Sequence, residues 1–357
     1  MSLRDRLAGQ VRAGGPLTVA QYMTACLHDP DFGYYATRPG LGADGDFITA
    51  PLVSQMFGEL IGVWAAECWD RLGRPARVLL VEAGPGDGTL MGDVLRAAGL
   101  VPQFLAAAEV WLVEVSEPLR AVQRARLGED VRWAKSLGDL PAGAPVILLA
   151  NELLDCLPAR QWVRTAKGWS ERMVGLDAQG ALAFGLGGAA PPVPSGWAQE
   201  RPGDVLEVSA AQEAFGDAAG ALAAREGGCA LLIDYGRAAP GPGDTLQALR
   251  RHQKVDPLAT PGEADLTVHA DFPAVLAAAA RQGASLAPLL TQGEFLRRLG
   301  IEARAAALSR ARPDRAGQVA RQLERLTGPD QMGELFKAAC VHSPGWTPPG
   351  FEEQEEA

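Results

Sequence analysis

Short apolar runs alternate with amphipathic segments through the middle of the chain. Apolar runs at 77–82, 110–115 and 145–150 predict strands, and the segments 89–98 and 118–127 predict helices between them. Strands that are apolar along their whole length and alternate with helices indicate a parallel sheet covered on both faces. We therefore predict an α/β fold with a mostly parallel sheet and helices on both faces.

The pattern changes on either side of this core. Residues 1–75 have mostly helical periodicity, and residues 161–187 contain short segments separated by Lys-Gly and Gln-Gly turns, which predict inserted antiparallel hairpins. We expect three parts: an N-terminal helical and lid segment, a core domain with its hairpin and Pro-rich insertion, and a flexible acidic tail. Their predicted bounds are 1–75, 76–343 with the insertion at about 161–202, and 344–357.

Composition narrows the class of protein. The net charge of −10 makes a nucleic-acid substrate unfavourable and suits a basic protein partner, and the abundance of Ala and Gly favours a GC-rich bacterial genome. The five cysteines include no C-x-x-C pair, so we expect neither a metal site nor a disulfide framework, and we expect a cytoplasmic protein. We expect no membrane insertion and no signal peptide, because the chain has no apolar run of 18 residues and its first residues are charged.

The sharpest signal is the glycine turn Gly84-x-Gly86-x-Gly88, which follows the first core strand and precedes a helix. Open α/β sheets bind ligands at such crossings, and glycine lets the backbone approach a ligand closely. Glu82 lies two residues before the first glycine, where its carboxylate would repel a pyrophosphate. The ammonium and sulfonium of S-adenosylmethionine would instead be attracted. The lysine that a Walker loop requires after its glycines is absent from this turn.

Glu114 provides a second acidic mark, at the end of the next predicted strand. A carboxylate in that position can accept hydrogen bonds from both ribose hydroxyls of an adenosine. Each signal has an ordinary alternative: the glycines could form only a tight turn, and Glu114 could neighbour a helix N-cap. Carboxylates on two successive strand ends favour the cofactor.

At these and further motifs the chain resembles the MidA-like methyltransferases. The matching stretches cover most of residues 16–337: 45–51, 54–59, the glycine turn, 112–116, 151–158, 234–236, 256–258, 265–267, 291–296 and 332–336. The resemblance implies a class I methyltransferase fold, S-adenosylmethionine as methyl donor and a protein arginine as acceptor. The family includes the mitochondrial complex I assembly factor, so it also implies a respiratory-complex subunit as partner. A basic residue is expected where this chain has Asp87.

Candidate acceptor residues follow two other strands. Asn151, Glu152 and Asp155 come directly after a buried strand, and Asn151 is assigned to the cofactor. On a helical turn Glu152 and Asp155 would share a face, where carboxylates could hold a guanidinium and accept a proton. Asp234 ends another apolar strand and is the third catalytic candidate. The alternatives are a cap for Asn151 or Asp155 and a turn residue for Asp234.

Two further segments are candidates for the walls of the site. As one strand, 265–271 would place Asp265, Thr267, His269 and Asp271 on one face, which we expect to be a solvated edge, with an acceptor wall as the alternative. His269 and His252 are candidate bases. Residues 45–54 precede the first core strand, and we expect Asp46, Thr49 and Ser54 to belong to a lid over the cofactor, with a structural loop as the alternative.

Three functions remain open on the sequence. The first is a protein arginine methyltransferase, which the inserted hairpins favour because they enlarge the acceptor side. The second is a small-molecule N- or O-methyltransferase with the same fold. The third is a cofactor-binding assembly factor with little catalysis, and the carboxylates at Glu82, Glu114, Glu152 and Asp155 argue against it. The fold alone does not decide among them.

Overall fold

The computed structural model describes residues 2–37, 49–189 and 201–352. The described chain divides into two compact units, and neither is continuous in sequence. Unit 1 comprises residues 1–47, 154–214 and 237–274, and unit 2 comprises residues 48–153, 215–236 and 275–357. This division follows packing and cuts across the linear segments expected from the sequence, because the N-terminal helices and the inserted strands fall in the same unit.

Unit 2 is built on a mostly parallel sheet. Its strand order is β15-β17-β10-β5-β2-β3-β4, and β16 also pairs with β17. The strands β4, β3, β2, β5 and β10 are parallel, whereas β17 is antiparallel to β10 and to β15 and β16. Their bounds are β2 (Val78–Ala83), β3 (Ala108–Val113), β4 (Arg132–Ala134), β5 (Val146–Asn151), β10 (Gly228–Arg237), β15 (Ser285–Leu286), β16 (Leu290–Thr291) and β17 (Phe336–His342).

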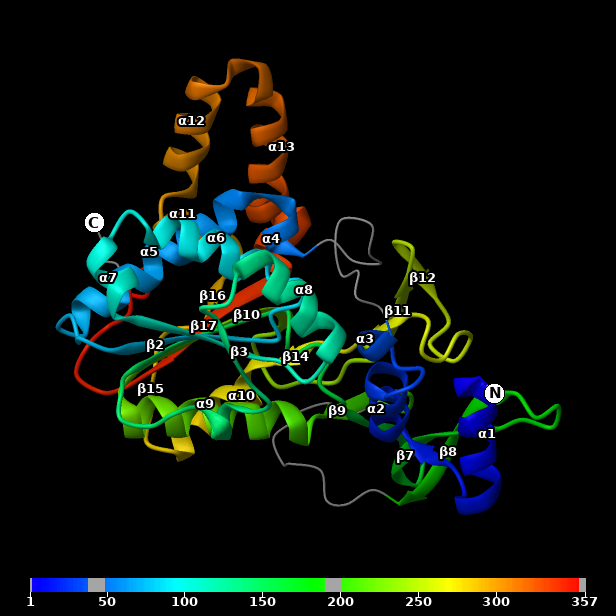
Figure 1. Cartoon of the computed structure of the whole chain (residues 1–357). Helices are drawn as coiled ribbons and strands as arrows, with labels where there is room; N and C mark the ends of the chain where they lie inside the picture. Colours follow the sequence, from blue (N-terminus) through cyan, green and yellow to red (C-terminus); the bar gives the residue numbers. More distant parts are fainter. Residues whose placement is uncertain (1, 38–48, 190–200, 353–357) are drawn as a thin grey trace. The chain divides into compact units, whose positions relative to one another are not determined.

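Helices cover both faces of this sheet, as the uninterrupted burial of β2 requires. Figure 1 shows α5 and α6 above the sheet and α9 and α10 below it. The helices that lie at least partly in this unit are α4 (Ala50–Val53), α5 (Gln55–Arg71), α6 (Thr89–Ala98), α7 (Pro102–Ala107), α8 (Glu117–Leu127), α9 (Ala210–Glu226), α10 (Phe272–Arg281), α11 (Gln292–Arg298), α12 (Ile301–Ala311) and α13 (Ala316–Thr327). Short helical turns lie at Leu137–Asp139, Pro313–Arg315 and Pro329–Gly333.

Unit 1 combines helices with antiparallel sheets. One sheet has the order β1-β7-β6-β9, with β8 on β7, and a second has the order β12-β11-β13. The elements are α1 (Leu3–Gly14), α2 (Val19–His28), α3 (Tyr34–Thr37), β1 (Leu17–Thr18), β6 (Arg160–Thr165), β7 (Gly168–Leu176), β8 (Leu182–Ala189), β9 (Val205–Val208), β11 (Gln247–Arg250), β12 (Gln253–Val255), β13 (Asp265–Thr267) and β14 (Ala270–Asp271). The core includes Val19, Met23, Ala159 and Val268.

The parallel core and the inserted antiparallel strands are confirmed. One strand is displaced: β3 ends at Val113, so Glu114 follows the strand instead of lying within it. The prediction of a single strand over 265–271 with a solvated polar face is wrong. The strand β13 ends at Thr267, and Asp265 and Thr267 are only 9% and 2% exposed. The break coincides with a contact to a distant part of the chain, because the backbone N–H of Val268 donates to the carbonyl of Asp155 at 2.9 Å.

Two glycines of α9 fix its distance from α10. A Cβ added at Gly216 would lie 2.3 Å from the carbonyl oxygen of Val275, and one added at Gly220 would lie 2.5 Å from that of Ala279. These residues are four apart and therefore on one face of the helix. The close approach of the two helices requires that this face carry no side chains.

We predict that Gly220→Ala lowers the free energy of unfolding by about 1–3 kcal/mol, although alanine is the better helix former, because the new methyl group overlaps backbone atoms of α10. Gly92→Ala, in α6, is the matched control: its nearest atom would be 3.5 Å away, and the variant should be as stable as the parent or up to about 1 kcal/mol more stable. Urea denaturation measures both. Equal stability of the two variants would contradict the packing role of Gly220.

Candidate functional site

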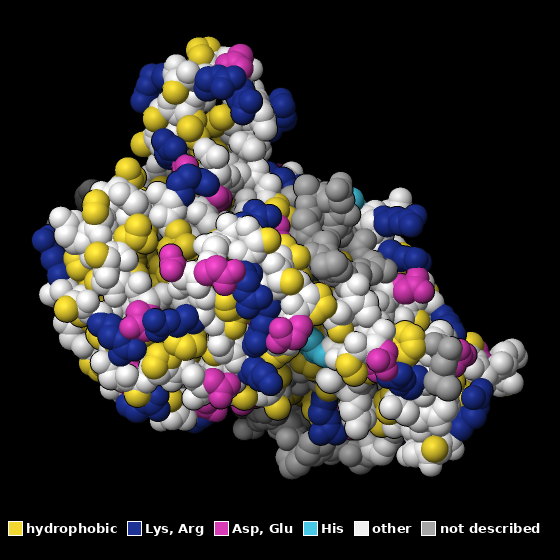
Figure 2. Space-filling model, in the orientation of Figure 1, with side chains coloured by type: hydrophobic (Ala, Val, Ile, Leu, Met, Phe, Trp, Pro, Cys, Tyr) yellow, Lys and Arg dark blue, Asp and Glu magenta, His cyan; other side chains and the backbone are white. Residues whose placement is uncertain are grey.

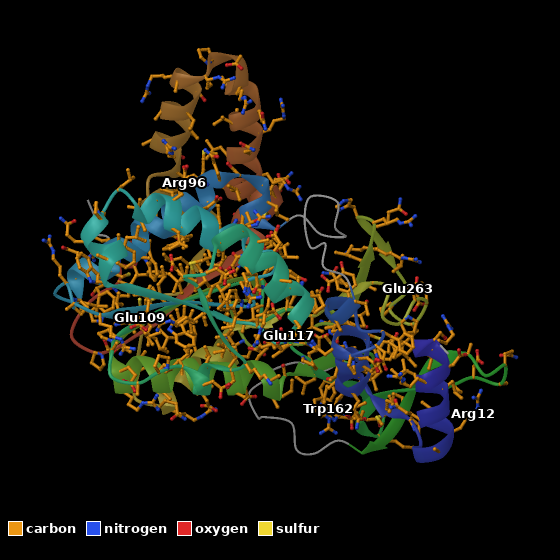
Figure 3. The ribbon with its side chains drawn as sticks, in the orientation of Figure 1. Arg12, Arg96, Glu109, Glu117, Trp162 and Glu263 are labelled. Atoms are coloured by element: carbon orange, nitrogen blue, oxygen red, sulfur yellow. The ribbon has the colours of Figure 1, made fainter. Side chains whose placement is uncertain are left out.

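The carboxyl ends of β2 and β5 form the point at which the strand order reverses. The strands β3 and β4 lie on one side of β2, and β5 and β10 lie on the other. In open α/β sheets, ligands bind in the crevice at such a point. Figure 3 labels the two ends of β3: Glu109 near its amino end, and Glu117 just past its carboxyl end. The candidate site lies on the Glu117 side.

The glycine turn adopts the backbone conformations that its sequence predicts. Gly84, Gly86 and Gly88 have φ values of 67°, 52° and 80°. A Cβ at Gly84 would lie 2.8 Å from Cδ1 of Leu153, whereas a Cβ at Gly86 would enter open space. Gly84 is therefore favoured by its left-handed backbone and by the nearby side chain of Leu153. Gly86 leaves room beside the backbone that a ligand could occupy.

Glu82 has a buried carboxyl and is the next-to-last residue of β2, just before the glycine turn. It is 3% exposed, and its Oε2 has no hydrogen-bond partner among the described residues. Burial raises the pKa of Glu82 to about 8, and the nearby charge of Asp87 adds to this, whereas a backbone hydrogen bond from Met91 opposes it. A buried acceptor atom without a partner is costly, so this position favours a ligand that donates a hydrogen bond or carries a positive charge.

Glu114 is linked to the glycine turn through Gln123. The backbone N–H of Ser116 donates to Oε1 of Glu114 at 2.7 Å, and Nε2 of Gln123 lies 3.3 Å from Oε2. The same Nε2 donates to the carbonyl of Gly86 at 2.8 Å, and Trp133 Nε1 donates to Oε1 of Gln123 at 2.8 Å. Burial raises the pKa of Glu114, against these hydrogen bonds. Glu114 is thus held rigidly beside the turn.

Gln123 is a site residue that the sequence analysis missed. It is fully buried, although it lies in α8 among charged residues. The available signal was its position four residues after Leu119, the other buried residue of that helix, so the two share a face. A lone glutamine on an apolar helix face indicates a specific hydrogen-bonded role.

Asp87 stands where the family pattern has a basic residue, and the structure compensates its charge. Its Oδ1 accepts from the backbone N–H of Thr89 at 3.0 Å, and its Oδ2 pairs with Arg126 at 2.8 Å. The carboxylate therefore accepts from the first N–H of α6 and is neutralised from α8. The departure from the family pattern leaves the geometry of the turn intact.

Asn151 and Glu152 occupy the end of β5, opposite the glycine turn. Glu152 has φ of 52°, an uncommon conformation for a residue with a side chain. Its backbone N–H donates to the carbonyl of Ile233 at 2.8 Å, and its Oε1 accepts from the backbone N–H of Ala50 at 2.9 Å and from Nδ2 of Asn151 at 3.0 Å. The Oδ1 of Asn151 is buried and has no hydrogen-bond partner in the part of the chain that is described.

The expected helical turn after β5 is absent, so Glu152 and Asp155 do not share a helix face. The left-handed backbone at Glu152 and its hydrogen bond to Ile233 turn the chain away from a helix. Glu152 belongs to unit 2 and Asp155 to unit 1. Asp155 is 6% exposed, and together with Asp265 its charge contributes to raising the pKa of Tyr35, for which burial is the larger cause.

Asp234 lies inside β10, which continues to Arg237, so the alternative role as a turn residue is wrong. Its side chain is fully buried, and Oδ1 accepts from the backbone N–H of Tyr235 at 2.8 Å. Because β5 ends opposite Ile233, Asp234 is the first residue of β10 beyond the end of its neighbour. It therefore stands at the same edge of the sheet as Asn151.

The lid residues have structural partners where they are described. Thr49 precedes α4, and its carbonyl accepts from the backbone N–H groups of Leu52 and Val53. Ser54 caps α5 through Met56 N at 3.3 Å and is buried. Asp46 lies outside the described residues. A cofactor-binding role of Thr49 and Ser54 stays a prediction.

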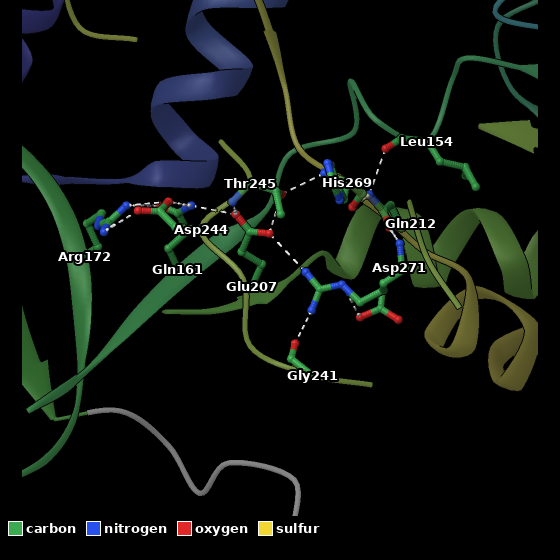
Figure 4. Close-up of polar contacts among 11 residues, drawn as sticks. Leu154, Gln161, Arg172, Glu207, Gln212, Gly241, Asp244, Thr245, His269 and Asp271 are labelled. Atoms are coloured by element: carbon green, nitrogen blue, oxygen red, sulfur yellow. Dashed lines mark hydrogen bonds and ion pairs between the residues drawn. The ribbon is translucent and has the colours of Figure 1, made fainter. Parts of the chain in front are cut away.

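Unit 1 contains a separate buried network around Glu207 (Figure 4). Glu207 accepts from Gln161, Arg237 and Thr245, at 2.7 Å from Gln161 Nε2 and 3.0 Å from Arg237 Nη2. Thr245 Oγ1 in turn accepts from the backbone N–H of His269 at 2.8 Å. The segment after β13 is therefore anchored through its backbone. His269 and His252 remain candidate bases that the structure does not test.

A second member of the network reaches the residues next to Asp155. Gln212 is 1% exposed; its Nε2 donates to the carbonyl of Leu154 at 2.8 Å and its Oε1 accepts from the backbone N–H of Asp271 at 2.8 Å. Asp155 is thus held through its backbone on both sides, by Gln212 before it and by Val268 after it. These contacts fix the backbone that carries the buried Asp155 side chain.

The residues of unit 2 fit S-adenosylmethionine. The buried oxygens of Glu82 and Asn151 need hydrogen-bond donors, which an ammonium group and hydroxyls supply. The open space beside Gly86 allows a ligand to contact the backbone, and Glu114 is a fixed acceptor for ribose hydroxyls. In the described ranges, no set of three His, Cys, Asp or Glu side chains is arranged to hold a metal ion, and no helix is long and apolar enough to cross a bilayer.

We predict a pH-dependent stability difference between the parent and Glu82→Gln in the absence of ligand. Because the folded pKa of about 8 lies above that of the unfolded chain, the contribution of Glu82 to stability is fully present below about pH 4.5 and is lost as the pH rises through 8. Across this range the free energy of unfolding of the variant should increase relative to that of the parent, by on the order of 4 kcal/mol in total. Urea denaturation from pH 5 to 9 measures the gain, and a pH-independent difference would refute it.

Comparison with known proteins agrees with this site. Residues 60–289 match the family model of the S-adenosyl-L-methionine-dependent methyltransferases. The chain is 36% identical to the mitochondrial protein arginine methyltransferase NDUFAF7 of Danio rerio, over 95% of this chain and 86% of that protein. It is 34% identical to the protein of the same name from Homo sapiens, over 92% of this chain and 80% of that protein.

A solved structure extends the likeness to three dimensions. A protein of Burkholderia thailandensis, crystallised with bound S-adenosyl-homocysteine, superposes with a TM-score of 0.83 at 28% identity, and the match covers 98% of this chain and 92% of that chain. S-adenosyl-homocysteine is the product that remains when S-adenosylmethionine has lost its methyl group. The glycine turn, the buried oxygens without partners and these matches agree. The chain belongs to the family of S-adenosyl-L-methionine-dependent methyltransferases.

Proposed function

We propose that this enzyme transfers the methyl group of S-adenosylmethionine to an arginine of a protein, and that a respiratory-complex subunit is the acceptor. The observation that carries the proposal is Glu152, a carboxylate held in a strained backbone conformation beside the reversal point of the strand order. Uncommon backbone conformations persist where the surrounding structure enforces them, and they concentrate at functional sites. The names of the relatives as protein arginine methyltransferases support the arginine.

The donor side is assigned to four residues. S-adenosylmethionine supplies an electrophilic methyl group on its sulfonium. Glu82 and Asn151 offer the buried oxygens for the ammonium and hydroxyl donors, Glu114 accepts from the ribose hydroxyls, and Gly86 lets the backbone approach. Because the pKa of Glu82 is near 8, the carboxyl is largely protonated near neutral pH, and binding of a cationic group there favours release of this proton to solvent. These residues align the donor and exclude water from it.

On the acceptor side, the carboxylates orient a guanidinium and remove its charge. Glu152 is bonded through Oε1 to Ala50 and Asn151, so its carboxyl plane is fixed. A fixed carboxylate can pair with a guanidinium by charge-assisted hydrogen bonds and accept a proton as the methyl group is transferred. Asp234, at the same sheet edge, and Asp155, in unit 1, are the further acceptor candidates.

We predict that Glu114→Gln weakens the binding of S-adenosyl-homocysteine by about 1.5–3 kcal/mol, roughly ten- to a hundredfold, because the ribose loses a charged acceptor. Glu117→Gln is the control, since its side chain is 76% exposed and lies just three residues further along the chain. Calorimetric titration measures both affinities, with NAD as a ligand that should not bind. Equal affinities for the two variants would remove Glu114 from the cofactor site.

We predict that Glu152→Gln binds S-adenosyl-homocysteine as the parent does but slows methyl transfer by about thirty- to a thousandfold, a loss of about 2–4 kcal/mol in transition-state stabilisation. The amide carries no charge, and its NH₂ group cannot accept from a guanidinium. The assay is single-turnover transfer of labelled methyl groups to soluble protein from cells that lack the gene, followed by amino-acid analysis.

Methyl-arginine as the labelled product is the expected outcome, and mass spectrometry of deletion and parent cells identifies the protein that carries it. Label in methyl-lysine or in small molecules alone would contradict the proposed acceptor. Parallel losses of cofactor affinity and rate would move Glu152 to the donor side. Full activity of the variant would shift the acceptor role to Asp234 or Asp155.

A further inference from the structure

The helical hairpin of α12 and α13 projects from the rest of unit 2 (Figure 1). Its two helices are joined by the short turn Pro313–Arg315. The inner face is apolar: Ala305 and Val319 are buried against Met56 of α5, with Leu308 and Leu323 packed around them. The outer faces are exposed, so the hairpin offers a surface to a partner.

This surface is basic on an acidic protein. Residues 301–327 contain six arginines and three acidic residues, whereas the whole chain has a net charge of −10. Figure 2 shows Lys and Arg side chains gathered over the projecting part of the molecule. A local positive surface on a negative protein attracts acidic partners and orients them as they approach.

Part of this charge is neutralised within the molecule, and part is not. Arg312 pairs with Asp314 at 2.8 Å, and Arg304 pairs with Glu59 at 2.9 Å. Four other arginines are exposed and form no ion pair within the ranges that the structure describes: Arg310, Arg315, Arg321 and Arg325. Arg321 and Arg325 lie one turn apart on α13, so they extend the basic surface from the tip of the hairpin towards its base.

The middle of α13 contacts the segment that holds Glu152. Gln322 of α13 donates from Nε2 to the carbonyl of Val53 at 2.8 Å, and its Oε1 accepts from Ser54 Oγ at 3.3 Å. Val53 ends α4, and the backbone N–H of Ala50 at the other end of α4 donates to Glu152. A protein bound along the hairpin would therefore lie next to the segment that positions the proposed acceptor carboxylate.

We propose that this hairpin is the docking arm for the protein acceptor and that it binds an acidic surface of that protein through Arg310, Arg315 and Arg321. The inference rests on the proposed function. A protein partner is favoured over nucleic acid because the rest of the chain is acidic and repels a phosphate backbone. It is favoured over a membrane because none of the large exposed hydrophobic side chains among the described residues lies on the hairpin.

The test is the triple charge reversal Arg310→Glu, Arg315→Glu and Arg321→Glu in the full-length chain. The control reverses Arg74, Arg225 and Arg281, which lie elsewhere in unit 2, are 69%, 65% and 55% exposed and each pair with a carboxylate of the same unit. The probe is intact soluble protein from cells lacking the gene, labelled with radioactive S-adenosylmethionine. The rate of labelling is measured against protein concentration and against NaCl from 25 to 250 mM.

For the hairpin variant, we expect the half-saturating protein concentration to rise at least tenfold. The maximal rate and the affinity for S-adenosyl-homocysteine should change less than twofold. The rate at low protein concentration should fall with salt for the parent and for the control, because salt screens the attraction to the acceptor protein. For the hairpin variant it should stay flat or rise, because the attraction is gone and salt screens any repulsion that replaces it. A merely structural role would instead change the maximal rate or the cofactor affinity.

Equal effects of the two triple variants would overturn the proposal, and so would an unchanged half-saturating concentration for the hairpin variant. Binding of duplex DNA and of phosphatidylserine vesicles is measured as well. The proposal is also overturned if loss of one of these is the only change in the hairpin variant. Failure of the proposed function has a different signature. In that case the parent enzyme labels no protein at any protein or salt concentration, while it still binds S-adenosyl-homocysteine. The docking role would then be refuted together with the proposed function.

Discussion

The parallel pairing of β2 with β5 is the constraint on which the site depends. In this register Ala83 lies opposite Ala150, so the glycine turn and Asn151 emerge at one edge of the sheet. Because β3 and β10 lie on the outer sides of this pair, the helices that follow diverge and leave room between the two strand ends. Burial of β2 and β5 among apolar neighbours stabilises this pairing, since nearly every side chain of the two strands is removed from water.

Burial also gives the site its chemistry. A carboxyl such as Glu82, placed where water cannot reach it, is costly to ionise and leaves an oxygen without a partner. The protein tolerates this cost in a region that the strands β2 and β5 stabilise. A donor with positive charge relieves it, so the same burial that weakens the ligand-free protein strengthens the binding of a cationic cofactor.

The acceptor side depends more on loops than on the sheet. Glu152 is fixed by Ala50, from α4, and by the backbone of Ile233, in β10. Three segments far apart in the sequence thus determine the position of one carboxylate. The helix α13 contacts one of these segments through Gln322, and this contact gives the exposed hairpin a physical connection to the site.

The sequence by itself determined the parallel core, the inserted antiparallel strands and the glycine turn, because apolar runs, turn residues and glycines act over short distances. The resemblance carried by its motifs added the family, which the comparisons confirm. Only the tertiary structure decided the role of Gln123, the break after Thr267 and the conformation of Glu152. Each of these depends on a partner distant in sequence, namely Gly86 for Gln123, Asp155 for the break and Ile233 for Glu152. No periodicity within a segment encodes such a contact, because its energy exists only after the chain has folded.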